Sequence, residues 1–325
     1  PTKILEVIGK DVKKESVILA HKDKKRSDFV VKEDDESDPL QPLRDIANNA
    51  ISMSNHEVAR LAINKIVEKG IELLKDEKDK DDAAKIAEHF VYHLEKIGTN
   101  AVSSKDPDFI DLVIGAMDSI AKTSKTDGGM KPFIQSLGYI GRECAEENMI
   151  VISDTSNDDI IYVIKNLGIL AVDNGFTGEN SSSQAAIFKI HEIGSILLKK
   201  EFKFLLIGSI VSVLKEIAEQ GIKKEKRSVV SYAVENIASY ALSAIDFPPF
   251  HKFVTKDGID ALKSIAIYSD KAGLKSIKPQ VIEDLEKILK KADEKGLDEV
   301  VTHAEKAITE LKGNTKSDDS LEGQN

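Results

Sequence analysis

A short pattern recurs at helix-sized intervals along this chain and restricts the folds that the chain can adopt. It consists of an apolar residue, two variable residues, Ile or Leu, and then Gly or Ala, as in Leu137-Gly138-Tyr139-Ile140-Gly141. The Ile or Leu of the pattern stands at positions 46, 66, 97, 120, 140, 170, 193, 217, 237, 265 and 288, and the two weaker copies, at 66 and 288, lack the small residue. An apolar pair three residues apart lies on one face of a helix, and Gly beside it lets a neighbouring helix approach closely. The pattern therefore predicts one amphipathic helix for each copy.

Each step between copies accommodates one helix and a short connection, and two successive steps span roughly 43–54 residues. One pair of helices cannot bury its own apolar stripe, so neighbouring pairs must stack to form a continuous core. We therefore predict an all-α fold, a right-handed α-solenoid of about a dozen helices. An irregular helical bundle is the alternative that the pattern leaves open.

The pattern and its period resemble those of armadillo and HEAT repeat proteins. The resemblance covers most of residues 38–312 and carries no functional motif. It implies an extended concave surface that binds peptides or proteins. Our leading hypothesis is a non-enzymatic protein–protein interaction scaffold whose partner is a protein or peptide.

A second resemblance concerns the segment from Asp38 to Ala47, Asp-Pro-Leu-Gln-Pro-Leu-Arg-Asp-Ile-Ala, followed by Ala50-Ile51. It is similar to part of certain uncharacterised prokaryotic membrane proteins, in which a helical cytoplasmic region follows transmembrane helices. The resemblance implies the cytoplasmic regulatory or sensory region of a membrane-anchored protein. Membrane contact would then occur only through an upstream segment absent from this chain, and the start at Pro1 rather than Met fits a processed form or a fragment.

The net charge, the cysteine count and the length of the apolar stretches argue against several classes of function. The net charge of −10 argues against a general nucleic-acid binder, because such proteins gain affinity by neutralising phosphates. The single Cys144 forbids an internal disulfide and favours a reducing, cytoplasmic compartment. The longest apolar stretch, 204–214, is too short to span a bilayer.

Three segments are expected along the chain. Residues 1–37 depart from the repeat and predict one helix followed by an irregular or short-strand segment. Residues 38–312 form the helical repeat domain, with a candidate sub-boundary in the polar loop 173–183. Residues 313–325 are polar and predict a disordered tail.

Capping patterns predict several helix starts. These are Asp38-Pro39, Ser54 with Glu57, Asp106-Pro107 and Ser181 with Gln184. Asp127-Gly128-Gly129 predicts a break, after which Pro132 opens the next helix.

No catalytic residue, cofactor or metal is predicted. His89 and His93 share a helix face, but the zinc-protease pattern needs Glu directly after the first His, where this chain has Phe90. No third ligand is evident in the sequence, so a half-buried polar face is expected. A cavity that joined these histidines to a carboxylate would revive the third hypothesis, an enzyme with an unrecognised site.

Three other features of the sequence are assigned to structure rather than to chemistry. Cys144 has no nearby His to act as its base, so we expect a buried structural thiol. Gly138 and Gly141 do not follow a strand and are assigned to helix packing. Ser181–Ser183 lack a phosphate-binding Gly pattern and are assigned to a helix cap.

Two features remain as candidate partner contacts. The first is a basic run, for which a solvated turn is the alternative: Lys223, Lys224, Lys226 and Arg227. The second is an aromatic cluster in the loop 246–253, for which a plug in the core is the alternative: Phe247, Phe250 and Phe253. Basic side chains suit an acidic partner, and exposed aromatic rings suit an anchor in an interface.

Overall fold

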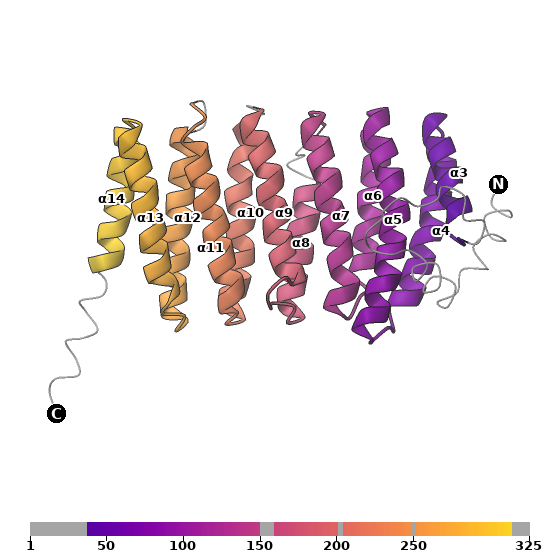
Figure 1. Cartoon of the computed structure of the whole chain (residues 1–325), viewed down its shortest axis with the longest axis horizontal. Helices are drawn as coiled ribbons and strands as arrows, with labels where there is room; N and C mark the ends of the chain where they lie inside the picture. The colour runs from indigo at the N-terminus through magenta and orange to yellow at the C-terminus, as the bar shows by residue number, and fades with distance from the viewer. Residues whose placement is uncertain (1–37, 150–158, 201–203, 249–250, 314–325) are drawn as a thin grey trace. The chain divides into compact units, whose positions relative to one another are not determined.

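The computed structural model describes residues 38–149, 159–200, 204–248 and 251–313. The described residues form twelve α-helices and no strand, which confirms the predicted all-α fold (Figure 1). The helices are α3 (Gln41–Ser52), α4 (His56–Leu74), α5 (Lys80–Ser104), α6 (Pro107–Ala121), α7 (Asp127–Glu146), α8 (Ile160–Asp173), α9 (Ser182–Lys199), α10 (Phe204–Lys223), α11 (Arg227–Ala244), α12 (His251–Lys271), α13 (Ile277–Glu294) and α14 (Asp298–Gly313). The predictions for residues 1–37, for Phe250 and for the tail from residue 314 lie outside the described residues.

The chain divides into two compact units between Phe176 and Thr177, within the polar loop 173–183. Unit 1 contains α3 to α8, and unit 2 contains α9 to α14. Each unit is built from three helical hairpins, and each is described here by itself.

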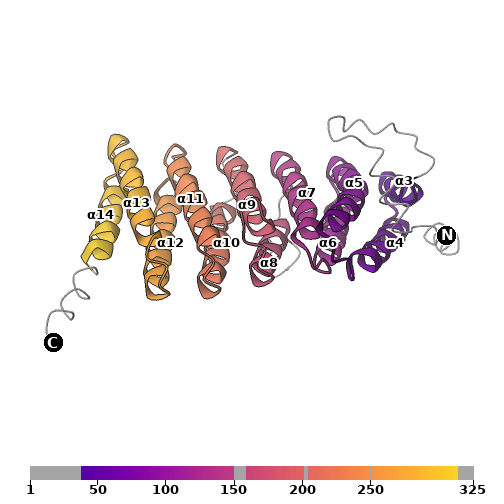
Figure 2. The same ribbon diagram turned by 60° about the horizontal axis from the view of Figure 1, so that its bottom comes forward.

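In unit 1 the helices alternate between two layers. Helices α3, α5 and α7 contact one another in sequence along one layer, and α4, α6 and α8 do so along the other (Figure 2). Each helix also packs on its neighbour in the chain. This is the arrangement expected when each amphipathic helix must cover its apolar stripe with adjacent helices.

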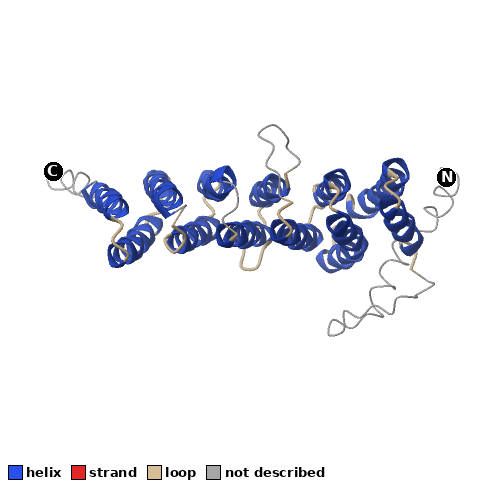
Figure 3. Ribbon diagram, turned by 90° about the horizontal axis from the view of Figure 1, so that it is seen from above, coloured by secondary structure: helices blue, strands red, loops and turns tan. Residues whose placement is uncertain are grey.

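Unit 2 repeats the same scheme. Helices α9, α11 and α13 form one layer, and α10, α12 and α14 form the other. A view along the helices shows the two rows within each unit (Figure 3). The fold is therefore an all-α, solenoid-like repeat.

The recurring pattern lies in the core between the layers. Its ruler positions, the Ile or Leu of each copy, are at most 1% exposed on nine helices: Ile66, Ile97, Ile120, Ile140, Ile193, Ile217, Ile237, Ile265 and Ile288. Ile46 and Leu170 are half-buried. They lie on α3 and α8, the first and last described helices of unit 1, which have a same-layer neighbour on one side only within the unit.

Two glycines leave room for ruler residues of the next helix in the same layer: Gly98, the small residue of its copy, and Gly70, which follows the ruler residue Ile66 by one helical turn. A β-carbon added at Gly98 on α5 would lie 2.7 Å from Cδ1 of Ile140 on α7. One added at Gly70 on α4 would lie 2.7 Å from Cδ1 of Ile120 on α6. The ruler Ile of one helix thus occupies space that a Gly leaves on the preceding helix of the same layer.

Helix starts follow the capping predictions in part. The Asp106 carboxylate accepts the Asp108 N–H at 3.0 Å and caps α6, with Pro107 at the first helical position, as predicted. The predicted start at Ser54 is wrong, since Ser54 has a φ of 52° and belongs to the turn. Asn55 caps α4 instead, accepting the Val58 N–H at 3.2 Å.

The predicted start of α7 at Pro132 is also wrong. The helix begins at Asp127, and the Thr126 hydroxyl accepts the Gly129 N–H at 3.0 Å. The two glycines lie in the first turn of the helix and do not break it. Glycine occupies this turn because α5 packs closely against it. A β-carbon at Gly128 would lie 2.5 Å from the Lys80 carbonyl oxygen at the start of α5.

A row of ion pairs joins α12 to α14 in unit 2. Lys252 and Lys256 both lie 3.0 Å from the Glu299 carboxylate. Farther along the same two helices, the Lys263 ammonium lies 3.1 Å from Glu310. The row connects the exposed sides of the two helices.

Candidate functional site

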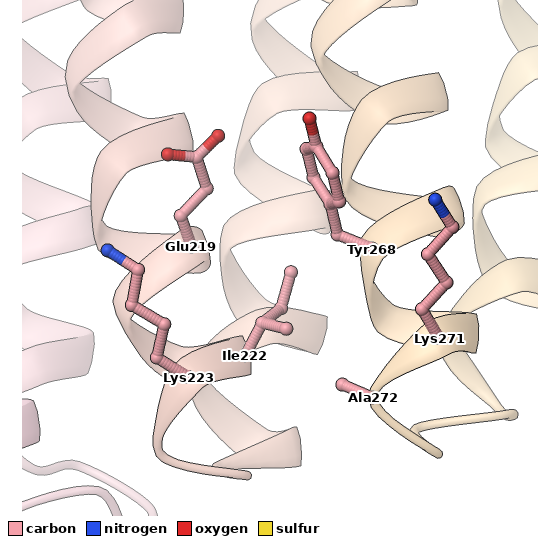
Figure 4. A pocket seen from close by; sticks show the side chains of 6 residues that line it. All are labelled: Glu219, Ile222, Lys223, Tyr268, Lys271 and Ala272. Carbon is pink, nitrogen blue, oxygen red and sulfur yellow. The ribbon is translucent and has the colours of Figure 1, made fainter.

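A hollow of about 480 Å³ lies between α10 and α12 in unit 2 (Figure 4). Its lining combines acidic, basic, aromatic and aliphatic side chains: Glu219, Ile222, Lys223, Tyr268, Lys271 and Ala272. The volume falls within the roughly 300–1,000 Å³ typical of ligand pockets. Since α10 and α12 are neighbours in one layer, the hollow is part of the surface of the repeat.

The repeat itself positions the two lysines of the hollow. Lys223 is the last residue of α10 and Lys271 the last residue of α12. They follow the ruler residues Ile217 and Ile265 by the same number of residues, so they occupy equivalent positions on adjacent helices. Cations in the last turn also interact favourably with the helix dipole.

The hollow offers both charge and apolar surface. Tyr268 is 49% exposed, which is high for an aromatic side chain, whereas Ile222 is nearly buried. Glu219 adds a carboxylate to the α10 wall, 3.6 Å from the Lys215 ammonium. In Figure 4, Glu219 and Lys223 come from one wall, and Tyr268 and Lys271 come from the other.

The four residues of the predicted basic run have different surroundings. Lys223 lines the hollow, whereas Lys224 is exposed in the turn after α10. Lys226 is half-buried at the N-cap position of α11, and Arg227 is the exposed first residue of that helix. The repeat thus brings one of these four residues to the hollow.

The prediction that Phe253 lies in a loop is wrong. Phe253 is on α12, which begins at His251, and it is 58% exposed. Proline is tolerated immediately before a helix and in its first turn, so the two prolines of the sequence are compatible with a helix that begins at His251. Phe247 is half-buried in the connection after α11.

Unit 1 contains a second cluster that sequence reasoning missed. Asp38, which precedes α3, faces His89 and His93 on α5. Nε2 of His89 lies 3.2 Å from Oδ1 of Asp38, and Nε2 of His93 lies 3.1 Å from Oδ2. All three side chains are at most 4% exposed. The histidines are therefore part of the core and do not form the half-buried polar face that we expected.

The prediction that Asp38 is the N-cap of α3 is therefore wrong. Leu40 occupies the N-cap position. Oδ1 of Asp38 instead accepts the Leu40 N–H at 3.0 Å and closes the turn before the helix. Asp38 stands 55 residues before His93, so only the packing of α3 on α5 brings the three groups together.

Burial and hydrogen bonding set the protonation of this cluster. Burial works to raise the pKa of the Asp38 carboxyl, but the two imidazoles hold that pKa well below its usual range. Burial lowers the pKa of His93 to about 4. At neutral pH the cluster therefore contains an ionised carboxylate and a neutral His93 ring.

The other candidates have structural roles. Cys144 is buried, and burial raises the pKa of its thiol to about 12, with a smaller contribution from Glu143. The Ser181 hydroxyl stands at the N-cap position of α9 but makes no capping bond, and it lies 3.0 Å from the Ser183 hydroxyl. Instead, the Gln184 side chain accepts the Asn180 N–H at 3.0 Å.

No helix in the part of the chain that the structure describes combines the length and apolar composition needed to cross a lipid bilayer.

Comparisons with known proteins add likenesses of fold. No protein-family model and no curated protein matches the chain. A solved structure described as a circular tandem repeat protein with novel repeat topology and enhanced subunit contact surfaces is 13% identical, with a TM-score of 0.48 over 86% of this chain and 70% of its own. Another, from the computational design of self-assembling cyclic protein homooligomers, is 15% identical, with a TM-score of 0.21 over 96% and 98%. The fold is defined by the helix contacts within the chain itself.

Proposed function

We propose that this chain is a non-enzymatic scaffold that binds a segment of a partner protein, and that the hollow between α10 and α12 is a contact site. Helical-repeat proteins bind partners along the surfaces that their stacked helices present. The observation that carries the proposal is the placement of Lys223 and Lys271 on opposite walls, together with the half-exposed ring of Tyr268.

The chemistry of the lining defines the partner segment. The two ammonium groups outnumber the single carboxylate of Glu219 in the lining and favour carboxylates. The aromatic ring favours an apolar side chain in the same contact. We therefore expect a short segment in which acidic residues stand beside an apolar residue. Because the whole chain carries a net charge of −10, the attraction would be local rather than long-range.

We further propose that the repeat is of the armadillo or HEAT kind. The first layer of unit 1 supports this assignment, since α3, α5 and α7 begin at Gln41, Lys80 and Asp127. These starts are separated by roughly the 40–47 residues of such repeats. An experimental structure would test the assignment through the handedness and curvature of the stack, and a left-handed stack would contradict it.

The test uses a displayed peptide library selected against the full chain. We expect enriched peptides to contain Asp or Glu next to an apolar residue. In a fluorescence-polarisation assay, the double variant Lys223→Glu/Lys271→Glu should lower the affinity for such a peptide at least about tenfold, which is about 1.4 kcal/mol.

The matched control is Lys290→Glu/Lys306→Glu. It makes the same change in net charge at two exposed lysines on α13 and α14, outside the hollow, and should leave the affinity unchanged. Circular dichroism would check that both variants are folded. Equal loss in the two double variants, or selection of peptides without acidic residues, would contradict the proposed site.

A further inference from the structure

The second inference concerns unit 1 and is independent of the proposed scaffold function. It starts from the convergence of three potential metal ligands. Nε2 of His89, Nε2 of His93 and a carboxylate oxygen of Asp38 all lie within 4.8 Å of one another. The two histidines come from one face of α5, because residues four apart in a helix are neighbours on its surface. Asp38 comes from the turn before α3.

The spacing of these atoms fits a small divalent cation. Zinc binds imidazole nitrogen and carboxylate oxygen at about 2.0–2.2 Å, so ligand atoms around a tetrahedral ion are about 3.3 Å apart. Each histidine approaches a different oxygen of the Asp38 carboxylate, Nε2 of His89 at 3.2 Å from Oδ1 and Nε2 of His93 at 3.1 Å from Oδ2, and both distances are close to this value. Two histidines and one carboxylate are also a ligand set of known zinc and iron(II) sites that keep a position open.

One buried nitrogen of the cluster lacks a well-formed hydrogen bond. Nε2 of His89 is close to Oδ1 of Asp38, but among the described residues it has no partner with acceptable hydrogen-bond geometry. Buried polar atoms in native structures nearly always have a partner. A cation bound to this nitrogen would satisfy it and would also neutralise the buried carboxylate.

We propose that Asp38, His89 and His93 bind a divalent transition-metal ion of the zinc class. The ion would join the start of α3 to the middle of α5, and so connect the two helices beyond their apolar contacts. Nδ1 of His93 has no hydrogen-bond partner among the described residues. Because such second-shell partners commonly strengthen metal binding about 10–100-fold, we expect an affinity below that of a fully supported zinc site.

The primary experiment measures zinc binding to the full chain after treatment with a chelator. Isothermal titration with Zn²⁺ should give one ion per chain, and Zn²⁺ should raise the melting temperature. Replacement of Zn²⁺ by Co²⁺ should give the visible absorption bands of a four- or five-coordinate ion. Weak six-coordinate bands at one equivalent, or no binding, would overturn the proposal without any variant being made.

Two variants locate the site. His93→Gln removes one ligand, and Asp38→Asn keeps the shape of the carboxylate while removing its charge. Each should lower the zinc affinity at least about 100-fold, more than the loss of a second-shell partner would. The control is His56→Gln, because His56 lies with Asp106 and Asp108 in the other grouping of potential ligands that the described residues contain.

The control variant should bind zinc as the wild type does. Binding that survives His93→Gln and Asp38→Asn but is lost in His56→Gln would overturn the assignment in favour of the exposed grouping. If a cluster variant fails to fold, as judged by circular dichroism, the Co²⁺ spectrum of the His56→Gln chain still decides the question. Four- or five-coordinate bands that persist in this variant support the buried cluster, and loss of those bands overturns it.

Discussion

The contact between Gly98 and Ile140 gives the most direct test of how the layers fit together. The perturbation is Gly98→Ala, which adds one methyl group to α5. In an open helical position this change should stabilise the chain by about 1 kcal/mol, because Ala is the better helix former. At Gly98 the new carbon would lie 2.7 Å from Cδ1 of Ile140 and 3.3 Å from Cγ1 of Val113.

The magnitude follows from these distances. Overpacking a well-packed core costs about 1–3 kcal/mol, which outweighs the gain in helix propensity. We therefore expect Gly98→Ala to destabilise the chain by up to about 2 kcal/mol. The matched control is Gly115→Ala on α6, where the added carbon meets nothing within 4 Å. That variant should gain about 1 kcal/mol.

The assay is urea unfolding followed by far-ultraviolet circular dichroism, since the chain has no Trp for fluorescence. The midpoints should move in opposite directions for the two variants at a similar slope. Adding Ile140→Val removes the Cδ1 atom that the new carbon meets, and should make Gly98→Ala less harmful than it is alone. If Gly98→Ala were as stabilising as Gly115→Ala, the proposed interlock of same-layer helices would be wrong.

Two further predictions concern buried titratable groups in unit 1. Burial raises the pKa of Asp159, the cap of α8, to about 6, above its unfolded value, so its contribution to stability is present at low pH and is lost as the pH rises through 6. Asp159→Asn should keep the capping bond to Ile161 and stabilise the chain by at most about 3 kcal/mol at pH 7. In urea titrations this gain in the free energy of unfolding should vanish below about pH 4. Equal gains at the two pH values would refute the prediction. Because burial raises the pKa of the Cys144 thiol to about 12, Ellman's reagent at pH 8 should modify it only as fast as the chain unfolds. Rapid modification of the folded chain would contradict the buried structural role.

The repeat could be predicted from the sequence because the spacing of apolar residues along one helix reports directly which face is buried. The ruler residues from Ile66 to Ile140 and from Ile193 to Ile288 lie in the core for this reason. Helix starts were harder to predict, since Ser54 and Asn55 are both good caps. The left-handed backbone of Ser54, which decides between them, cannot be seen in the sequence.

The candidate sites depend on which helices share a layer, and the unequal gaps between copies do not reveal this. Lys271 and Tyr268 were missed because α12 had not been placed beside α10. Lys223 and Lys271 occupy equivalent positions in the repeat. This equivalence would have placed them side by side once α10 and α12 were known to be neighbours. Asp38 was missed as a partner of the histidines because it had already been assigned to a helix cap, and no local pattern links it to α5.

The ion pairs between α12 and α14 make the end of the repeat sensitive to ionic strength. Dissolved salt screens exposed charges, so Lys252, Lys256 and Lys263 should hold the last helix less firmly in concentrated buffer. The apolar contacts between the layers would not loosen in the same way. Helix α12 also forms one wall of the hollow. Weaker ion pairs with α14 at high salt would therefore loosen this wall on the side that faces α14, opposite the hollow.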